Sequence, residues 1–404
     1  MIADVPTQSV ALGIRSASFR LLLLGSLGSF SGFGLLLPAV PLRALNTGSG
    51  EVGAGLTTAA LMLTTVAAQL LMPRLIARLG YRWTLGLGSL LLGLPAPLYA
   101  LSSATEALVG VSAVRGLGFG LITVAGSALA VELVPGGQRG RATALYGVAV
   151  GVPQLFCLPG GVWAVESLGS LTLFLIGGLL PVMAVVPIAF IRSVAYDAIP
   201  RERATADPAG AGQAMSWVRT VRLLGVPWLV MVAGAIAFGG LVTFFPASVA
   251  PRTSVATAVL FALPLAMITG RWVSGVATDR AVGNTPLLTV GVGVAASGLA
   301  AITVASARPD AFTSAVLGGV LFGLGFGAVQ NQTLVLMFGR AGRSGVQWAS
   351  AAWNIAYDAG TGIGALLLGT VVAYQGYAGA FGLTAIVVLL SGVLTANRSF
   401  RRAS

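Results

Sequence analysis

The sequence has little charge for its length. Only 8% of its 404 residues are charged and 56% are hydrophobic, whereas a soluble globular domain carries about 25% charged residues. These charges are too few to cover the surface of a water-soluble globule of this size. The composition therefore excludes a soluble enzyme and predicts an all-α membrane protein with many spans.

Lysine and histidine are absent, and Cys157 is the single cysteine. Without histidine the chain has no imidazole for acid–base chemistry or metal ligation. One cysteine forms neither an internal disulfide nor a thiolate cluster. The lysine of a phosphate-binding Gly-x-x-x-x-Gly-Lys loop is also missing. We therefore expect no enzyme activity, no metal, no cofactor and no ATP-driven step.

Apolar runs separated by glycine, proline and arginine predict twelve transmembrane helices. Each run is close to the 20 or so residues that cross the hydrocarbon of a bilayer. The longest connection, residues 192–222, is charged and is predicted to link an N-terminal six-helix bundle, 1–191, to a C-terminal one, 223–404. The predicted spans are 19–42, 53–72, 83–101, 107–132, 142–164, 169–191, 223–247, 255–277, 286–306, 312–337, 347–373 and 377–396.

The arginines are divided unequally between the two sides of these spans. Three lie on the side away from the N-terminus (Arg43, Arg252 and Arg308), and Arg115 and Arg271 lie within or near spans. By the positive-inside rule both termini and the linker are cytoplasmic, in what we expect to be a bacterial inner membrane. This asymmetry explains the net charge of +12 without nucleic acid. The remaining eighteen, on the N-terminal side, are Arg15, Arg20, Arg74, Arg78, Arg82, Arg139, Arg141, Arg192, Arg201, Arg203, Arg219, Arg222, Arg280, Arg340, Arg343, Arg398, Arg401 and Arg402.

Two segments of the first half recur in the second. Gly-Leu-Gly-Phe-Gly at 116–120 returns at 323–327, and the loop 73–82 aligns with 275–283. The offsets are 207 and 202 residues, about half of the chain. Two repeats at nearly the same offset predict pseudo-symmetric six-helix halves, an arrangement that suits a transporter rocking about a site at mid-depth.

These segments resemble the major facilitator superfamily, whose loop signature is Gly-x-Leu-x-Asp-Arg-x-Gly-Arg-Arg after helices 2 and 8. Pro73 and Ala77 stand where the first loop of the family has glycine and aspartate. The resemblance implies that the matching residues act in gating at the cytoplasmic side. They are Arg78, Gly80 and Arg82 in the first loop and Gly275, Asp279 and Arg280 in the second.

Two further motifs are similar to those of the drug/proton antiporter branch. Arg115, followed by Gly118 and Gly120, resembles the arginine- and glycine-rich motif of helix 4. A broken version of the Gly-Pro-x-x-Gly-Gly motif of helix 5 lies at residues 147–161. This resemblance implies efflux by proton exchange.

Asp358 lies in the middle of a predicted span, where an ionised carboxyl costs roughly 2.5–3.5 kcal/mol. Hydrocarbon favours the neutral form of a carboxyl group. A group that takes up a proton on one side and releases it on the other can couple transport to a proton gradient. The alternative is a buried aspartate that is simply hydrogen-bonded to a neighbouring helix.

Arg115 is the second candidate for proton coupling, because a guanidinium stays charged and could pair with Asp358. It could instead hold a substrate anion, or extend its side chain to water. Asn354 lies one helical turn from Asp358 on the same face, and Tyr357 is adjacent. Both are candidates for substrate binding, with inter-helix hydrogen bonding as the alternative for Asn354.

A polar run in the tenth predicted span supplies Gln330 and Asn331 as further substrate-binding candidates, while Gln332 is expected to face another helix. Gln154 is a weaker candidate. Arg271 aligns with Gln69 at the 202-residue offset, and its position near the cytoplasmic edge favours a role in gating.

The prediction is a monomeric secondary active transporter that works by alternating access in a lipid membrane. We expect proton-coupled efflux of small, partly apolar compounds. The alternative is an importer or facilitator of a sugar, metabolite or organic acid. Its partners would be a small-molecule substrate, protons and membrane lipid, and no nucleic acid.

Overall fold

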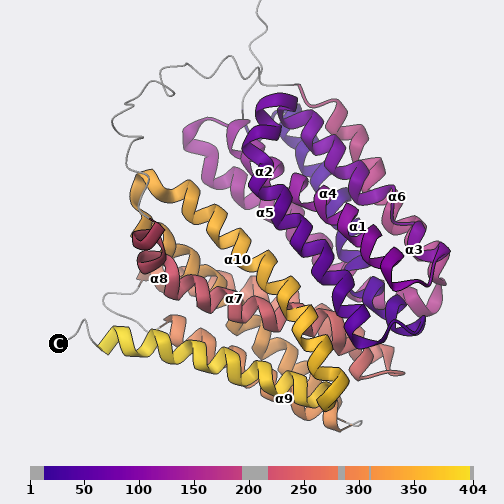
Figure 1. Ribbon diagram of the computed structural model, residues 1–404. Coiled ribbons are helices and arrows are strands. Elements are labelled where there is room, and N and C mark those ends of the chain that lie inside the picture. Colours follow the sequence, from indigo (N-terminus) through magenta and orange to yellow (C-terminus); the bar gives the residue numbers. More distant parts are fainter. Residues whose placement is uncertain (1–12, 193–216, 281–286, 309–310, 401–404) are drawn as a thin grey trace, which may run out of the picture.

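The computed structural model of this chain describes residues 13–192, 217–280, 287–308 and 311–400. Within these ranges all regular structure is helical (Figure 1). The elements are α1 (Ala17–Asn46), α2 (Gly50–Gly93), α3 (Leu98–Leu101), α4 (Thr105–Glu132), the 3-10 turn η1 (Gly136–Gln138), α5 (Arg139–Ser167), α6 (Ser170–Ala189), α7 (Trp217–Ser248), α8 (Thr253–Arg280), α9 (Leu287–Ala307) and α10 (Phe312–Phe400).

Ten helices of the described residues are long and apolar enough to cross a membrane, two fewer than the sequence predicted. The predicted spans 53–72 and 83–101 fall in one candidate span of 52 residues, Gly50–Leu101. The last two predicted spans fall in another, Ala349–Val393, of 45 residues. Inside each, well away from its ends, a glycine has a positive φ, Gly80 at 73° and Gly376 at 70°, and there the backbone leaves the helical conformation.

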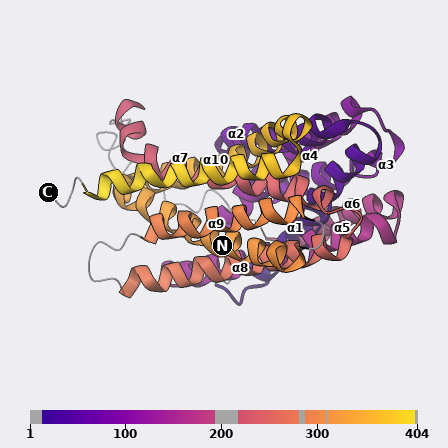
Figure 2. The ribbon, with the colours of Figure 1, turned by 90° about the horizontal axis from the view of Figure 1, so that it is seen from below.

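The helices form two groups. Helices α1 to α6 pack on one another and make the N-terminal group, and α7 to α10 make the C-terminal group. Figure 1 shows the first group in indigo to magenta and the second in rose-red through orange to yellow. The last part of α10 lies alongside α9, which Figure 2 shows from below.

The packing inside the two groups repeats as the sequence does. A side chain on Gly116 of α4 would collide with the carbonyl oxygen of Leu61 in α2. A side chain on Gly323 of α10 would collide with that of Leu263 in α8. The glycines are 207 residues apart and their partners 202, the offsets found in the sequence. The same close helix contact is therefore built twice.

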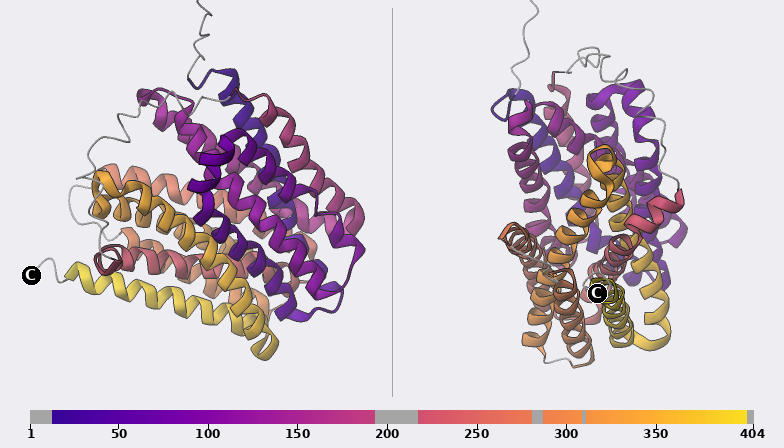
Figure 3. Two further views of the ribbon diagram at one scale, coloured as in Figure 1. Left: turned by 45° about the horizontal axis from the view of Figure 1, so that its top comes forward. Right: turned by 90° about the vertical axis from the view of Figure 1, so that its left-hand side faces the viewer.

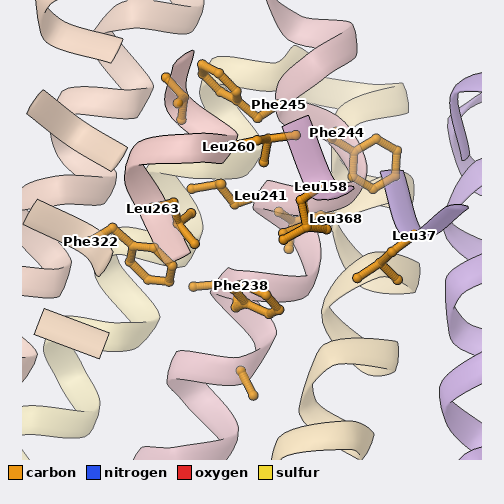
Figure 4. Close-up of a cluster of buried hydrophobic side chains, with 14 of the residues drawn as sticks. Leu37, Leu158, Phe238, Leu241, Phe244, Phe245, Leu260, Leu263, Phe322 and Leu368 are labelled. Atoms are coloured by element: carbon orange, nitrogen blue, oxygen red, sulfur yellow. The ribbon is translucent and has the colours of Figure 1, made fainter. Parts of the chain in front are cut away.

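The two ends of the molecule differ in how the groups meet. We call the end with Arg74, Arg78, Arg139 and Arg141 the Arg-rich side, and the end with the turn between α1 and α2 the Arg-poor side. The largest cluster of buried apolar side chains contains residues of both groups. Figure 4 shows Leu37 and Leu158 of the N-terminal group in this cluster with C-terminal residues such as Leu241, Leu260 and Leu368.

Toward the Arg-rich side the core divides. One cluster, which includes Phe19 and Leu129, belongs to the N-terminal group alone. Another, built on Leu224, Met337 and Ala349, belongs to the C-terminal group alone. The groups converge at one end and diverge at the other, as Figure 3 shows. The described conformation is thus joined at the Arg-poor side and separated at the Arg-rich side.

Small residues make the join possible. A side chain on Gly55 of α2 would collide with the carbonyl oxygen of Ala365 in α10. One on Gly362 of α10 would lie 2.8 Å from the Cβ of Met62 in α2. Helices α2 and α10 therefore approach at nearly backbone contact across the two groups.

Candidate functional site

Asp358 lies where this contact between the groups ends. Its side chain is 6% exposed, and the Nε2 of Gln69 in α2 donates a hydrogen bond to its Oδ2 at 2.6 Å. A second side-chain hydrogen bond that joins the groups is longer, 3.4 Å between the hydroxyls of Thr58 and Thr243. Gln69 precedes the break at Gly80 by about three helical turns. The carboxyl group thus lies well inside the spanning region, at the edge of the join.

The side-chain amide of Gln69 has a hydrogen-bond partner for its nitrogen but none for its oxygen. Its Oε1 is buried and has no hydrogen-bond partner. A buried acceptor without a partner is destabilising unless some state of the protein supplies a donor. A protonated Asp358 is such a donor.

Tyr357 belongs to a column of rings in the C-terminal group. Its ring is parallel to within 15° of Trp353 and 8° of Phe326, with centroids 6.2 Å apart in both cases. Phe238 of α7 lies 5.8 Å away on another side. The indole nitrogen of Trp353 donates to the hydroxyl of Thr333 at 3.1 Å. These contacts fix the ring column on α10.

Arg271 of α8 lies next to this column. Its Nε donates to the Oε1 of Gln330 in α10, and its guanidinium carbon is 5.9 Å from the centre of the Trp353 ring. Part of the Arg271 side chain remains exposed, whereas Gln330 is 1% exposed. The Nε2 of Gln330 is buried without a partner. The structure therefore brings Arg271, predicted to act in gating, together with a predicted substrate-binding glutamine.

The rest of the polar run in α10 serves helix packing. The Nε2 of Gln332 donates to the hydroxyls of Thr278 at 2.6 Å and Ser274 at 2.8 Å, so Gln332 faces α8. The amide nitrogen of Asn331 is 3.5 Å from the Ser274 hydroxyl and 3.8 Å from where a side chain on Gly275 would begin. Asn331 thus lies beside the second loop motif rather than beside Asp358.

Arg115 is 1% exposed and has a local partner. Proline at position 95 has no N–H, and the N–H of Ala96 bonds to the carbonyl of Gly93, so the carbonyl of Leu92 loses its helical donor. The Nε of Arg115 donates to this carbonyl at 2.9 Å. Arg115 thereby caps the end of α2, where a positive charge is also favourable.

A pair between Arg115 and Asp358 is not formed in this conformation. The Nη1 of Arg115 reaches the hydroxyl of Tyr99 at 3.4 Å, and its guanidinium lies 5.5 Å from the centre of that ring. Both partners belong to the N-terminal group. Asp358 takes its hydrogen bond from Gln69 instead. The position of a residue along a helix does not tell which neighbour its side chain faces, which is why the sequence suggested this pair.

The other two candidates for substrate binding lie in different groups. Asn354 is exposed, and its amide donates to the carbonyl of Ser350 within α10 at 2.9 Å. Gln154 is half-buried in α5, where its backbone faces Gly34 of α1. Of the two, Asn354 lies one turn from Asp358.

The first loop motif surrounds the break in α2. Arg78 is exposed, Gly80 has the positive φ, and the guanidinium of Arg82 lies 5.3 Å from the centre of the Trp83 ring. The side chains of the second motif's Asp279 and Arg280 lie outside the described residues, as does most of the predicted linker, 192–222.

Comparison with known proteins agrees with this architecture of membrane-spanning helices. Residues 22–357 match the Major Facilitator Superfamily, and the chain belongs to this family. No curated protein sequence matches it.

Two similar solved structures cover nearly the whole chain. The crystal structure of a D-xylose-proton symporter has a TM-score of 0.72 at 15% identity, over 94% of this chain and 96% of that one. The nucleoside transporter NupG, in a mutant form, has a TM-score of 0.69 at 12% identity, over 94% and 98%. Identities this low show the fold alone.

The chain is thus an integral membrane transporter and not an enzyme. The family prediction is confirmed, whereas the comparisons do not single out the drug/proton antiporter branch.

Sequence reasoning gave too little weight to Gln69 and Arg271 as residues of the candidate site. Each is a strongly polar side chain in an apolar stretch, and they stand at equivalent positions of the two halves. Gln69 contacts the opposite group, whereas Arg271 contacts its own. Their separation of 202 residues, the offset of the loop repeat, was the feature of the sequence that could have identified them.

Proposed function

We propose that this protein is a secondary active transporter that works by alternating access, with Asp358 coupling substrate movement to a proton gradient. One observation carries the proposal. A buried carboxyl group is held by a single hydrogen bond across the contact between two separately packed groups.

Protonation would change that bond directly. The ionised carboxylate of Asp358 can only accept, and it accepts from the amide nitrogen of Gln69. The protonated acid can also donate, and the Oε1 of Gln69 is an acceptor without a partner. The acid and the amide can then form two hydrogen bonds instead of one. The proton therefore strengthens the contact between the groups, and its loss weakens it.

Alternating access needs two bodies, and we propose two six-helix bundles, 1–191 and 223–404, joined by the linker 192–222. Each of the two longest candidate spans would then cross the membrane twice, bending at Gly80 or Gly376, for twelve crossings in all. A length of 45 or 52 residues is more than twice what one crossing needs, which supports this division.

We place the Arg-rich side, with both termini and the linker, in the cytoplasm of a bacterial cell by the positive-inside rule. The described conformation would then be open to the cytoplasm. The two loop motifs on this side would form the gate that closes in the opposite conformation. They comprise Arg78, Gly80, Arg82, Gly275, Asp279 and Arg280. We expect the working unit to be a monomer.

For the direction of transport we propose efflux of small, partly apolar compounds. The ring column on α10 supports a partly apolar substrate. Uptake is the second candidate, because one of the two similar structures is a proton symporter of a sugar and the other is a nucleoside transporter.

Everted membrane vesicles with an imposed proton gradient test the coupling. A panel of compounds is added, and the internal pH is followed with an acridine dye. We expect at least one compound to collapse the gradient in vesicles that contain the native chain, and none to do so with Asp358→Asn.

Glu166→Gln is the matched control, since it neutralises an exposed carboxylate near the end of α5. It should behave as the native chain. Compound-dependent proton movement that survives in Asp358→Asn would remove this residue from the mechanism. Equilibration that ignores the gradient would indicate a facilitator.

A further inference from the structure

Arg271 carries a charge that the described residues do not compensate. Its guanidinium stays protonated at any physiological pH. In the described part of the chain, no carboxylate lies within ion-pair distance of it, and its hydrogen bond goes to the neutral amide of Gln330. A charge at membrane depth is costly unless it meets water or an anion. This guanidinium is therefore set up to receive a negative partner.

The neighbouring amide adds a second donor without an acceptor. Gln330 is 1% exposed, and its Nε2 has no hydrogen-bond partner. Its Oε1 is held by Arg271, so the free Nε2 is fixed close to the guanidinium. Arginine has five N–H donors, and one of them is used here. The free guanidinium N–H groups and the Nε2 of Gln330 are donors, so a ligand that satisfies them must supply acceptor oxygens.

A flat apolar surface lies directly beside these donors. The ring of Trp353 is 5.9 Å from the guanidinium carbon of Arg271, and the ring of Tyr357 is stacked on the Trp353 ring at 15°. Tyr357 directly precedes Asp358 in α10. The rings thus connect the donors to the candidate proton site.

We infer that Arg271, Gln330, Trp353 and Tyr357, the Arg271 cluster, bind an organic anion with a carboxylate on a flat apolar body. The carboxylate pairs with Arg271 and accepts from the Nε2 of Gln330, as guanidinium–carboxylate geometry favours. The apolar body lies against the rings. The inference rests on the proposed function for transport of this anion, but binding itself needs no gradient.

Isothermal titration of the purified full chain in detergent tests the inference with two probes, benzoate and benzamide. They share a flat ring and differ in charge. The native chain should bind benzoate at least about tenfold more tightly than benzamide, a difference of about 1.4 kcal/mol. Equal affinities, or no binding of benzoate at millimolar concentration, would overturn the inference.

Variants locate the site. Arg271→Gln should lower the affinity for benzoate about tenfold or more and leave that for benzamide within about twofold. Arg74→Gln removes an exposed arginine elsewhere and should change neither affinity. Unchanged benzoate affinity in folded Arg271→Gln would overturn the inference. If that variant fails to fold, Gln330→Met replaces it with the same criterion.

Asp358→Asn separates this inference from the proposed function. It should keep benzoate binding while losing proton coupling. Proton-coupled transport by a native chain that does not discriminate benzoate from benzamide would overturn the anion site and leave the proposed function standing. Benzoate binding without any proton-coupled transport would have the opposite meaning.

Discussion

Contacts inside each group of helices differ from contacts between the groups. Inside the N-terminal group, Arg115 bonds to a backbone carbonyl and to Tyr99. Inside the C-terminal group, the amide nitrogen of Gln332 bonds to two hydroxyls. Between the groups, the described residues show isolated hydrogen bonds, one at Asp358 and one at Thr58. The internal contacts are built to persist, and those between the groups can be exchanged one at a time.

Apolar packing shows the same division. Glycine-based helix contacts inside the groups, such as that of Gly116 in α4 with helix α2, occur in equivalent places of both halves. Glycine-based contacts between the groups, such as that of Gly55 in α2 with helix α10, lie toward the Arg-poor side. At the other side the buried core separates into one cluster for each group. Two firm bodies that touch at one end are what a rocking movement requires.

The largest expected effect concerns the contact between the groups at mid-depth. One proton that crosses 100 mV provides about 2.3 kcal/mol, or a concentration ratio of roughly forty. Proteoliposomes with the native chain should approach that ratio for a substrate exchanged one for one. Asp358→Asn should stay near a ratio of one yet still exchange labelled for unlabelled substrate. Loss of exchange as well would mean that Asp358 holds the substrate rather than the coupling proton.

A second substitution tests the close packing of α2 against α10 between the groups. Gly55→Leu should disfavour the described conformation by about 1–3 kcal/mol, because the added side chain meets the backbone at Ala365. The Arg-rich side should then close in most molecules, as measured by distances between spin labels. Gly110→Leu is the control, since the position is exposed and a side chain there meets nothing within 4 Å. Equal effects of the two variants would contradict a specific contact.

A third substitution attacks a contact inside a group. Arg115→Leu leaves the carbonyl of Leu92 without a donor, which should lower the free energy of unfolding by about 1–3 kcal/mol. Denaturation in detergent measures this loss, with Arg74→Leu as the exposed control. Transport per folded molecule should persist. Uncoupled transport by well-folded Arg115→Leu would restore Arg115 to the coupling site.

The smallest effect is expected at the weaker of the two hydrogen bonds between the groups. The hydroxyls of Thr58 and Thr243 are 3.4 Å apart, near the limit for such a bond. Thr58→Val keeps the shape of the side chain and should shift the balance of conformations by about 0.5 kcal/mol, or roughly twofold. A shift as large as that of Gly55→Leu would show that this bond, rather than close packing, holds the join.

The fold could be predicted further than the site. Hydropathy, arginine distribution and two repeats predicted an all-helical membrane protein of this family. The arginines of 73–82 marked a boundary between two spans, but the sequence could not show that this segment is itself helical and that the helix breaks only at Gly80. The predicted gap between residues 373 and 377 coincides with the bend at Gly376 in α10, although no separate loop forms there.

At the site, the sequence singled out Asp358 from its depth alone. It could not identify Gln69 as its partner in preference to Arg115, because that choice depends on helix rotation. The partner of Arg115 also depends on Pro95, because the carbonyl of Leu92 has no helical N–H donor there and accepts from Arg115 instead. The sequence likewise could not show that the neighbours of Arg271 are the neutral amide of Gln330 and the ring of Trp353 rather than a carboxylate.

Distances between pairs of spin labels show whether the two groups move as separate bodies under the control of Asp358. With Cys157 replaced by serine, labels at the exposed positions Leu145 in α5 and Val335 in α10 report across the groups. Labels at Leu145 and Leu71 report within the N-terminal group. We expect a change of pH to move the first distance distribution and leave the second unchanged, and Asp358→Asn to abolish the pH response. Equal movement of both pairs, or a pH response that survives in Asp358→Asn, would contradict this expectation.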